Sequence, residues 1–128
     1  MNNSKKTSQY SIVSVAAYEF IIAKNLSPED AWKLAAEKNI KSVEGRKKGC
    51  TRAAFLGLCD HGHLKNITGS NSYESKNYNY AKFAAEIMKT DPTIPKRDSW
   101  LSVQNKFKTS ASHQGQLDVV IGLLEFMV

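Results

Sequence analysis

The sequence predicts an all-α protein in which two tandem three-helix repeats form one helical bundle. Apolar residues recur at the spacing of a helix face, and no window alternates apolar and polar residues as a strand would. Residues of the first half also recur in order in the second half, which is typical of repeat architectures. The pairs are Tyr10 with Tyr78, Ala16 with Ala84, Ala17 with Ala85, Phe20 with Met88, Trp32 with Trp100, Lys38 with Lys106, and Phe55–Asp60 with Val120–Glu125.

The repeat predicts how the chain is organised. A polar tail at 1–9 should be frayed, repeat one covers 10–64, a linker covers 65–76 and repeat two covers 77–128. A copy this small cannot bury its own apolar face, so both should share one core with pseudo-twofold symmetry. The 128 residues fit a single domain of this kind.

Local signals place the helices of the first repeat. Apolar spacing predicts a first helix over 10–24. Ser27 suits an N-cap and Pro28 the first helical position, so a second helix should run from there to about residue 38. The sequence then predicts a polar connection at 39–49, a third helix over about 50–61 and a glycine C-cap at Gly62.

The second repeat follows the same plan. Its first helix should cover 77–89, and the prolines that follow should break the chain. A helix containing Trp100 comes next, with Asp98 or an earlier residue as its cap. A loop at 109–114 leads to a final helix over 116–127, which is apolar on most sides and suits the centre of a bundle.

Gly57 and Gly122 occupy matching positions in the two third helices. Glycine inside a helix costs up to about 1 kcal/mol relative to alanine, so its presence in both copies indicates a close approach of helix backbones. The simplest geometry crosses one third helix over the other at these glycines.

The net charge of +6 favours an acidic partner, either nucleic acid or an acidic protein surface. The positive charge is uneven, because five basic residues between positions 41 and 52 face a single acid, Glu44. These are Lys41, Arg46, Lys47, Lys48 and Arg52.

The two cysteines indicate a reduced, cytoplasmic protein. If Cys50 and Cys59 share a helix, their Cα atoms are about 13 Å apart, too far for a disulfide. The apolar stretch 12–22 contains Glu19 and reads as a core helix, not as a signal peptide or membrane span. We therefore expect no membrane association.

The leading candidate site is an anion- or nucleic-acid-binding segment formed by Arg46, Lys47, Lys48, Gly49 and Arg52. It coincides with the expected start of the third helix, where free backbone N–H groups and the helix dipole favour anions. The second copy has no such cations. The alternative is a basic loop that only faces water. The segment is not a phosphate-binding P-loop, because the required Gly-Lys-Ser/Thr and a preceding strand are missing.

Metal and enzyme readings are weaker. Cys50, Cys59, His61 and His63 match no common zinc spacing, and we expect no metal or cofactor. Cys59 aligns with Leu124 and His61 with Phe126, so both should be structural. Cys50 near a helix start could be a reactive thiolate, but nothing pairs it with an imidazole base, and we predict no catalytic residue.

Two nucleic-acid readings rest on aromatic residues and on helix pairs. Trp32 and Trp100 hold equivalent positions, which indicates core and not base stacking. Tyr73, Tyr78 and Tyr80 leave open a weak basic-aromatic surface around the linker. A standard helix-turn-helix reader is excluded, because the connection between the second and third helices is too long. A looser arrangement that places a helix in a groove through Lys47, Lys48 and Arg52 stays open.

The block Lys47–Cys59, with Gly62 and Gln116–Val120 after it, resembles an uncharacterised family of small bacterial proteins, a domain of unknown function. The resemblance implies a bacterial or phage cytoplasmic setting, and it implies no activity, ligand or catalytic residue.

The sequence thus favours a non-enzymatic binding module, a monomer or weak dimer, that engages nucleic acid or an acidic protein through its basic segment. A small cysteine-dependent enzyme and an assembly protein without a nucleic-acid role are the alternatives.

Overall fold

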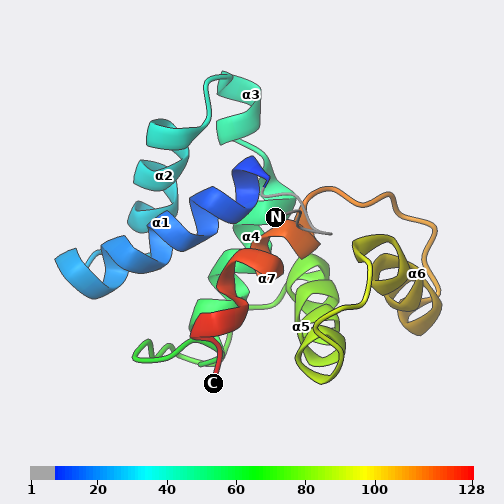
Figure 1. The fold of residues 1–128 in the computed structure, drawn as a ribbon. Coiled ribbons are helices and arrows are strands. Elements are labelled where there is room, and N and C mark those ends of the chain that lie inside the picture. Colours follow the sequence, from blue (N-terminus) through cyan, green and yellow to red (C-terminus); the bar gives the residue numbers. More distant parts are fainter. Residues whose placement is uncertain (1–7) are drawn as a thin grey trace.

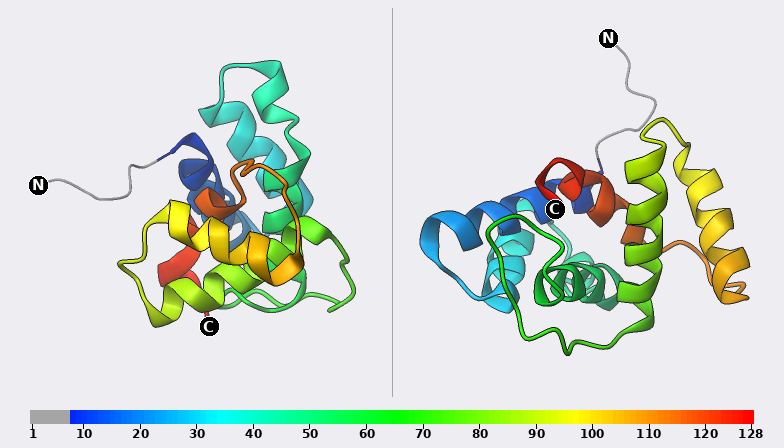
Figure 2. Two further views of the ribbon diagram at one scale, coloured as in Figure 1. Left: turned by 90° about the vertical axis from the view of Figure 1, so that its right-hand side faces the viewer. Right: turned by 90° about the horizontal axis from the view of Figure 1, so that it is seen from below.

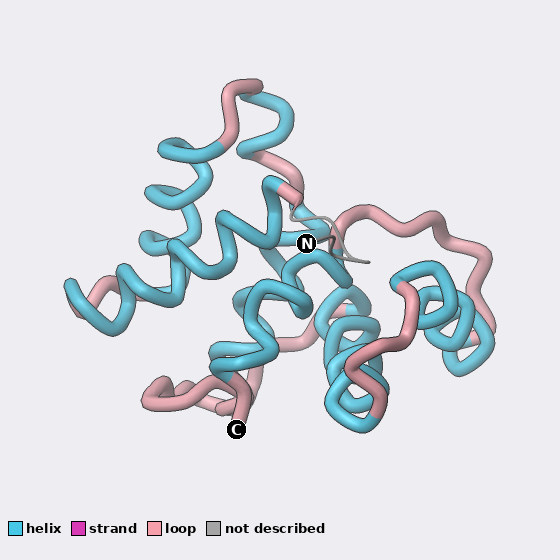
Figure 3. Tube along the Cα trace, in the orientation of Figure 1, coloured by secondary structure: helices cyan, strands magenta, loops and turns pink. Residues whose placement is uncertain are grey.

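A computed structural model describes residues 8–128. Residues 1–7, most of the tail predicted to fray, lie outside the described part. The helices are α1 (Gln9–Lys24), α2 (Pro28–Asn39), α3 (Val43–Arg46), α4 (Gly49–Asp60), α5 (Lys76–Thr90), α6 (Lys96–Phe107) and α7 (Gln116–Leu123), followed by the 3-10 turn η1 (Leu124–Phe126). Within 8–128 there is no strand (Figure 3), only one isolated bridge between Leu64 and Met127. The all-α, single-domain prediction is confirmed.

Helix boundaries follow short-range signals in the sequence. The Ser27 hydroxyl accepts the backbone N–H of Asp30 at 3.1 Å, as expected of the cap of α2. At the end of α4, Gly62 adopts φ +74°, and the N–H of His63 donates to the carbonyl of Leu58. This is the Schellman ending that a glycine after a helix predicts.

Two features differ from prediction, the connection after α2 and the end of α7. The connection after α2 contains the short helix α3, which Ser42 caps by accepting the N–H of Gly45 at 3.0 Å. α6 begins at Lys96 with Pro95 as N-cap, which agrees with the expected cap at Asp98 or an earlier residue. α7 ends at Leu123 and not at residue 127, because the chain becomes extended at Met127, where it pairs with Leu64.

Helices from the first half of the chain pack against helices from the second half. α1 packs against α2 of its own half and against α7 of the other, while α4 packs against α5. Figure 1 shows α7 in the middle of the molecule, with α1 and α2 on one side and the α5–α6 pair on the other. The two views in Figure 2 show α5 and α6 side by side. The final helix, α7, therefore lies in the centre, as its apolar sequence predicts.

Both tryptophans belong to the core. Trp32 is 2% exposed and its ring lies 5.1 Å from that of Phe55, while Trp100 is 7% exposed and meets Tyr80 edge-on at 5.6 Å. The structural reading of the tryptophans is confirmed. Tyr78 and Tyr80 are also buried, which leaves only Tyr73 of the three tyrosines partly open to solvent.

Gly57 and Gly122 mark close contacts, but with other partners than predicted. A Cβ on Gly57 would fall on the Tyr78 side chain of α5, and one on Gly122 would lie 2.6 Å from the Ser11 carbonyl oxygen of α1. Each glycine thus lets a third helix approach the first helix of the opposite half. The predicted glycine contact between the two third helices is wrong, because the nearest neighbours of Gly57 belong to α5 and those of Gly122 to α1. The internal duplication itself stays a prediction.

Candidate functional site

The basic segment (Arg46, Lys47, Lys48, Gly49 and Arg52) lies where α3 ends and α4 begins. Lys47 closes α3, its N–H reaching the carbonyls of Val43 and Glu44 at 3.2 Å. Lys48 is the N-cap of α4, and its side chain makes no capping hydrogen bond. The Lys48 side chain therefore leaves the free backbone N–H groups in the first turn of α4 unoccupied. A helix-terminal anion site requires such free N–H groups.

Arg46 is held in place by the backbone. Its Nε donates to the carbonyl of Ile40 at 2.6 Å, and the residue is half-buried. Tyr10 of α1 supports the same turn, because its hydroxyl donates to the carbonyl of Gly45 at 3.1 Å. The hydrogen bond at Nε thus fixes the orientation of the Arg46 guanidinium group. Its two terminal nitrogens remain available to donate to another acceptor.

A cleft of about 590 Å³ lies between α2, α3 and the start of α4. Three cations of the basic segment line it: Arg46, Lys47 and Arg52. The structure does not bring the other two members there. Lys48 turns toward α1, with its Nζ 5.2 Å from the centre of the Tyr10 ring, and Gly49 is exposed outside the cleft.

The cleft also contains acids that sequence reasoning missed as site residues. Glu29, Asp30 and Glu37 of α2 line it, together with Lys33. Among residues 8–128 no ion pair joins these acids to the cations, since the ion pair found there is Lys96 with Asp118. The signal was present in the sequence, because residues 29, 33 and 37 recur every four positions and share a helix face. Glu29 and Asp30 do not stand out in the sequence, because acids in the first turn of a helix are expected from the helix dipole alone.

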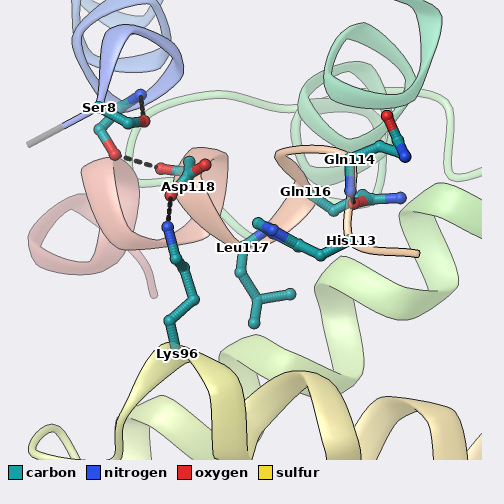
Figure 4. Close-up of polar contacts among 8 residues, drawn as sticks. Ser8, Lys96, His113, Gln114, Gln116, Leu117 and Asp118 are labelled. Carbon is teal, nitrogen blue, oxygen red and sulfur yellow. Dashed lines mark hydrogen bonds and ion pairs between the residues drawn. The ribbon is translucent and has the colours of Figure 1, made fainter.

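The corresponding region of the other half is closed by its own side chains (Figure 4). Nε2 of His113 accepts the backbone N–H of Leu117 at 3.1 Å, so the imidazole occupies a free donor of α7's first turn. The Gln116 side chain accepts the N–H of Gln114 at 2.8 Å. Lys96 of α6 forms its ion pair with Asp118 of α7 at 2.7 Å. The start of α7 is thus occupied from within the molecule.

The surroundings of His113 favour the neutral form of its imidazole ring. Burial, the largest cause, lowers its pKa below the ordinary value of 6.5, and the nearby Lys96 and Lys48 lower it further, while Asp118 opposes them. A neutral ring is what the hydrogen bond from Leu117 requires, because a protonated Nε2 cannot accept.

The other histidines and the cysteines lie in separate surroundings. His61 stacks on Tyr78 with ring centres 4.5 Å apart and contacts the Tyr73 carbonyl at 2.7 Å, while Nε2 of His63 lies 2.8 Å from the Tyr78 hydroxyl. Cys59 is buried, and burial raises the pKa of its thiol, as a core position predicts. In the described chain no cluster of three or more histidines, cysteines or acids could hold a metal ion.

Asp60, at the end of α4, organises the connection between the halves. Its carboxylate accepts the backbone N–H groups of Ser70, Ser72 and Tyr73 at 2.7–2.8 Å, and the hydroxyl of Ser70 as well. These hydrogen bonds hold the pKa of Asp60 far below its usual 3.8. All of its acceptor positions face the protein's own donors, so Asp60 serves as a structural anchor.

The fold and the site together define an all-α, single-domain protein with a charged cleft beside an open helix start. The chain belongs to the Family of unknown function (DUF6979), which matches residues 7–127. This agrees with the resemblance to an uncharacterised domain family. No curated protein and no solved structure matches the chain. Across residues 8–128, every helix is too short or too polar to cross a lipid bilayer.

Proposed function

We propose that the protein is a non-enzymatic binding module of the cytoplasm, a monomer or weak dimer, that engages an anionic partner through its basic segment. The partner is nucleic acid or an acidic protein. The observation that carries the proposal is the gathering of Arg46, Lys47 and Arg52 in one cleft without an ion-pair partner among the described residues. Cations that the fold leaves unpaired are available to an external anion.

The local structure supports this proposal in two further ways. The Ile40 carbonyl holds Arg46 in one orientation, which lowers the side-chain entropy lost on binding. The uncapped start of α4 adds the positive end of a helix dipole next to the same cations.

The geometry offers less to a cysteine-dependent enzyme. Cys50 is half-buried in the first turn of α4, and no histidine side chain in the described part of the chain is hydrogen-bonded to it. A nucleophile of this kind needs a base within hydrogen-bond reach.

The test is fluorescence anisotropy with three labelled probes: a DNA oligonucleotide, an RNA oligonucleotide and a polyglutamate peptide. Wild type is compared with the double variant Lys47→Ala/Arg52→Ala, at two residues whose side chains are exposed and form no ion pair among residues 8–128. We expect at least one probe to bind at low salt and to bind about tenfold more weakly to the variant. For a nucleic-acid probe, the dependence on salt should also become shallower.

The matched control is Lys38→Ala/Lys82→Ala, which removes the same charge from exposed positions of α2 and α5 outside the cleft. Equal weakening in both double variants would show a general charge effect and not a site. If none of the probes binds at low salt, the proposed function is wrong.

A further inference from the structure

The side of α1 that faces solvent is apolar. Its opposite side, which contains Val13, Ala17 and Tyr18, is buried where α1 packs against α2 and α7. The residues on the solvent side recur every three or four positions and therefore share one helix face, called here the outer face of α1. A surface helix usually carries polar and charged residues on this side, whereas here Glu19 is the only one. The outer face consists of Ile12, Val15, Ala16, Glu19, Ile22 and Ala23.

Within residues 8–128, no element covers the outer face. Ile12 is 45% exposed and Ile22 is 47% exposed. Figure 1 shows α1 across the front of the molecule, and the right-hand view of Figure 2 shows α1 and α7 along its upper edge. Association is driven by removing such apolar surface from water, so an uncovered apolar helix face indicates an interaction surface.

The spacing on this face is that of two packed helices. Ile12, Val15, Glu19 and Ile22 follow one another at intervals of three, four and three residues. This is the seam by which one helix packs along another in a coiled coil. The occupant that the outer face suits is therefore a second helix.

The same seam reads alike in both directions. Its four residues are placed symmetrically about position 17. If two copies of α1 lie antiparallel with this position aligned, Ile12 of each copy faces Ile22 of the other, and Val15 faces Glu19. A twofold dimer requires such a self-complementary surface, because the same residues serve both sides of the contact.

Glu19 favours the antiparallel pairing over a parallel one. In a parallel pair the two Glu19 carboxylates would face each other across the symmetry axis, and like charges so placed oppose association. In the antiparallel pair the two positions are offset by about 6 Å along the helix axis. Each copy also carries a net charge of +6, so salt should strengthen the contact by screening the repulsion between copies.

The size of the outer face indicates a weak dimer. From Ile12 to Ala23 it is about 17 Å long, and a helix with its side chains is about 10 Å wide. A stable dimer buries about 800 Å² on each partner, far more than such a strip offers. The two copies should therefore associate only at high concentration.

We propose that the outer face of α1 is the contact between two copies of this chain, which form a weak, antiparallel, twofold-symmetric dimer. The inference does not depend on the basic segment and goes beyond the proposed function, because it assigns a surface and a partner to α1. The cleft with Arg46, Lys47 and Arg52 is lined by α2, α3 and α4, so the dimer leaves it open in both copies.

The first experiment is sedimentation equilibrium of the full chain from about 10 μM to about 1 mM, at low and at high salt. We expect wild type to dimerise within this range and more tightly at high salt. Ile22→Glu should weaken dimerisation at least about tenfold. The matched control is Leu101→Glu on α6, at a side chain 48% exposed, which should stay within about twofold of wild type. Glu19→Gln should tighten the dimer about two- to fivefold, because it removes the like charges near the axis. Circular dichroism melts confirm that each variant is folded.

The second experiment tests the register by disulfide cross-linking in a Cys50→Ser background. Chains with Ile12→Cys are mixed with chains with Ile22→Cys, one of them carrying a tag, and oxidised with copper phenanthroline. The mixture should form a cross-linked heterodimer, because these two positions face each other. Each variant alone should give little product, since the two copies of position 12 are about 15 Å apart, too far for a disulfide. Cys59 is 1% exposed and does not compete.

Several results would overturn the inference. A chain that stays monomeric up to about 1 mM would show that the outer face does not bind a second copy. A dimer that Ile22→Glu leaves intact would place the contact elsewhere. Cross-linking of Ile12→Cys with itself would show a parallel pair, and weaker association in Glu19→Gln would show that Glu19 pairs with a cation. None of these results bears on the proposed function, whose test changes only Lys47 and Arg52.

Discussion

The starts of α4 and α7 are the most instructive comparison in the molecule. Each begins the last helix of its half, but the start of α7 at Gln116 is buried, whereas the start of α4 at Gly49 is exposed. At α7 the side chain of His113 occupies a backbone donor, and at α4 the N-cap residue Lys48 provides no such bond. The two helix starts thus differ in whether a side chain of the protein occupies a free backbone donor of the first turn.

The connections that lead into these helices show the same difference. Before α4, the chain forms the short helix α3 and gathers cations beside α2. Before α7, it runs without a helix, and the carbonyl of Ala111 accepts the indole N–H of Trp100 and the amide of Gln104. The connection before α7 is hydrogen-bonded to α6 of its own half, whereas the connection before α4 lines a cleft.

The largest expected effect comes from the paired tryptophans, which test whether both halves depend equally on their core. Trp32→Ala and Trp100→Ala should each lower the free energy of unfolding by about 3–5 kcal/mol, the cost of removing a buried tryptophan. Urea denaturation followed by circular dichroism measures it. Leu101→Ala, at a side chain 48% exposed, is the control and should change stability by less than about 0.5 kcal/mol. A small loss in only one tryptophan variant would show that one half contributes little to the core.

Gly57 and Gly122 lie where helices of the two halves come closest, and substitutions there provide a second test of the comparison. Gly57→Ala and Gly122→Ala should each cost about 1–3 kcal/mol, because the added methyl group meets Tyr78 in one case and the backbone of Ser11 in the other. Gly122→Ala should be the more damaging, since a backbone carbonyl cannot turn aside. Gly49→Ala is the control, because a Cβ there has nothing within 4 Å. Unfolding midpoints at matched m-values give the ranking, which fails if Gly49→Ala is as harmful as the others.

The smallest effect concerns the closed start of α7 and depends on pH. Because the pKa of His113 is lowered in the folded protein, its stabilising effect is present above the ordinary value of 6.5 and is lost as the pH falls. His63, whose pKa burial also lowers, acts in the same direction. The free energy of unfolding should therefore decrease as the pH falls below about 6.5.

His113→Gln separates the two histidines. Glutamine keeps an oxygen that can accept the Leu117 N–H but cannot titrate, so this variant should lose part of the pH dependence that the wild type shows. His113→Ala should cost about 0.5–2 kcal/mol at pH 7.5, the usual worth of a helix cap. Thermal melts across the pH series measure both. An unchanged pH profile in His113→Gln would contradict the role assigned to the ring.

Local signals predicted much of the fold, because helix caps and apolar spacing act over a few residues. Ser27, Gly62 and the two tryptophans were placed correctly for that reason. The shortened α7 was missed, since its end is set by the pairing of Met127 with Leu64, which lies far away in the sequence. The partners of Gly57 and Gly122 were missed on the same ground, because spacing identifies a close approach without naming the surface that approaches.

By itself, the sequence determined that this protein is all-α, that its final helix is central and that its cations gather around residues 46–52. These properties follow from composition and from interactions between near neighbours in the chain. Only the tertiary structure decided which cations share a cleft, that Lys48 turns to Tyr10 instead, and that acids of α2 line the same cleft. The physical reason is that the facing of α2 toward α3 and α4 is set by packing of the whole core, and no local pattern encodes it.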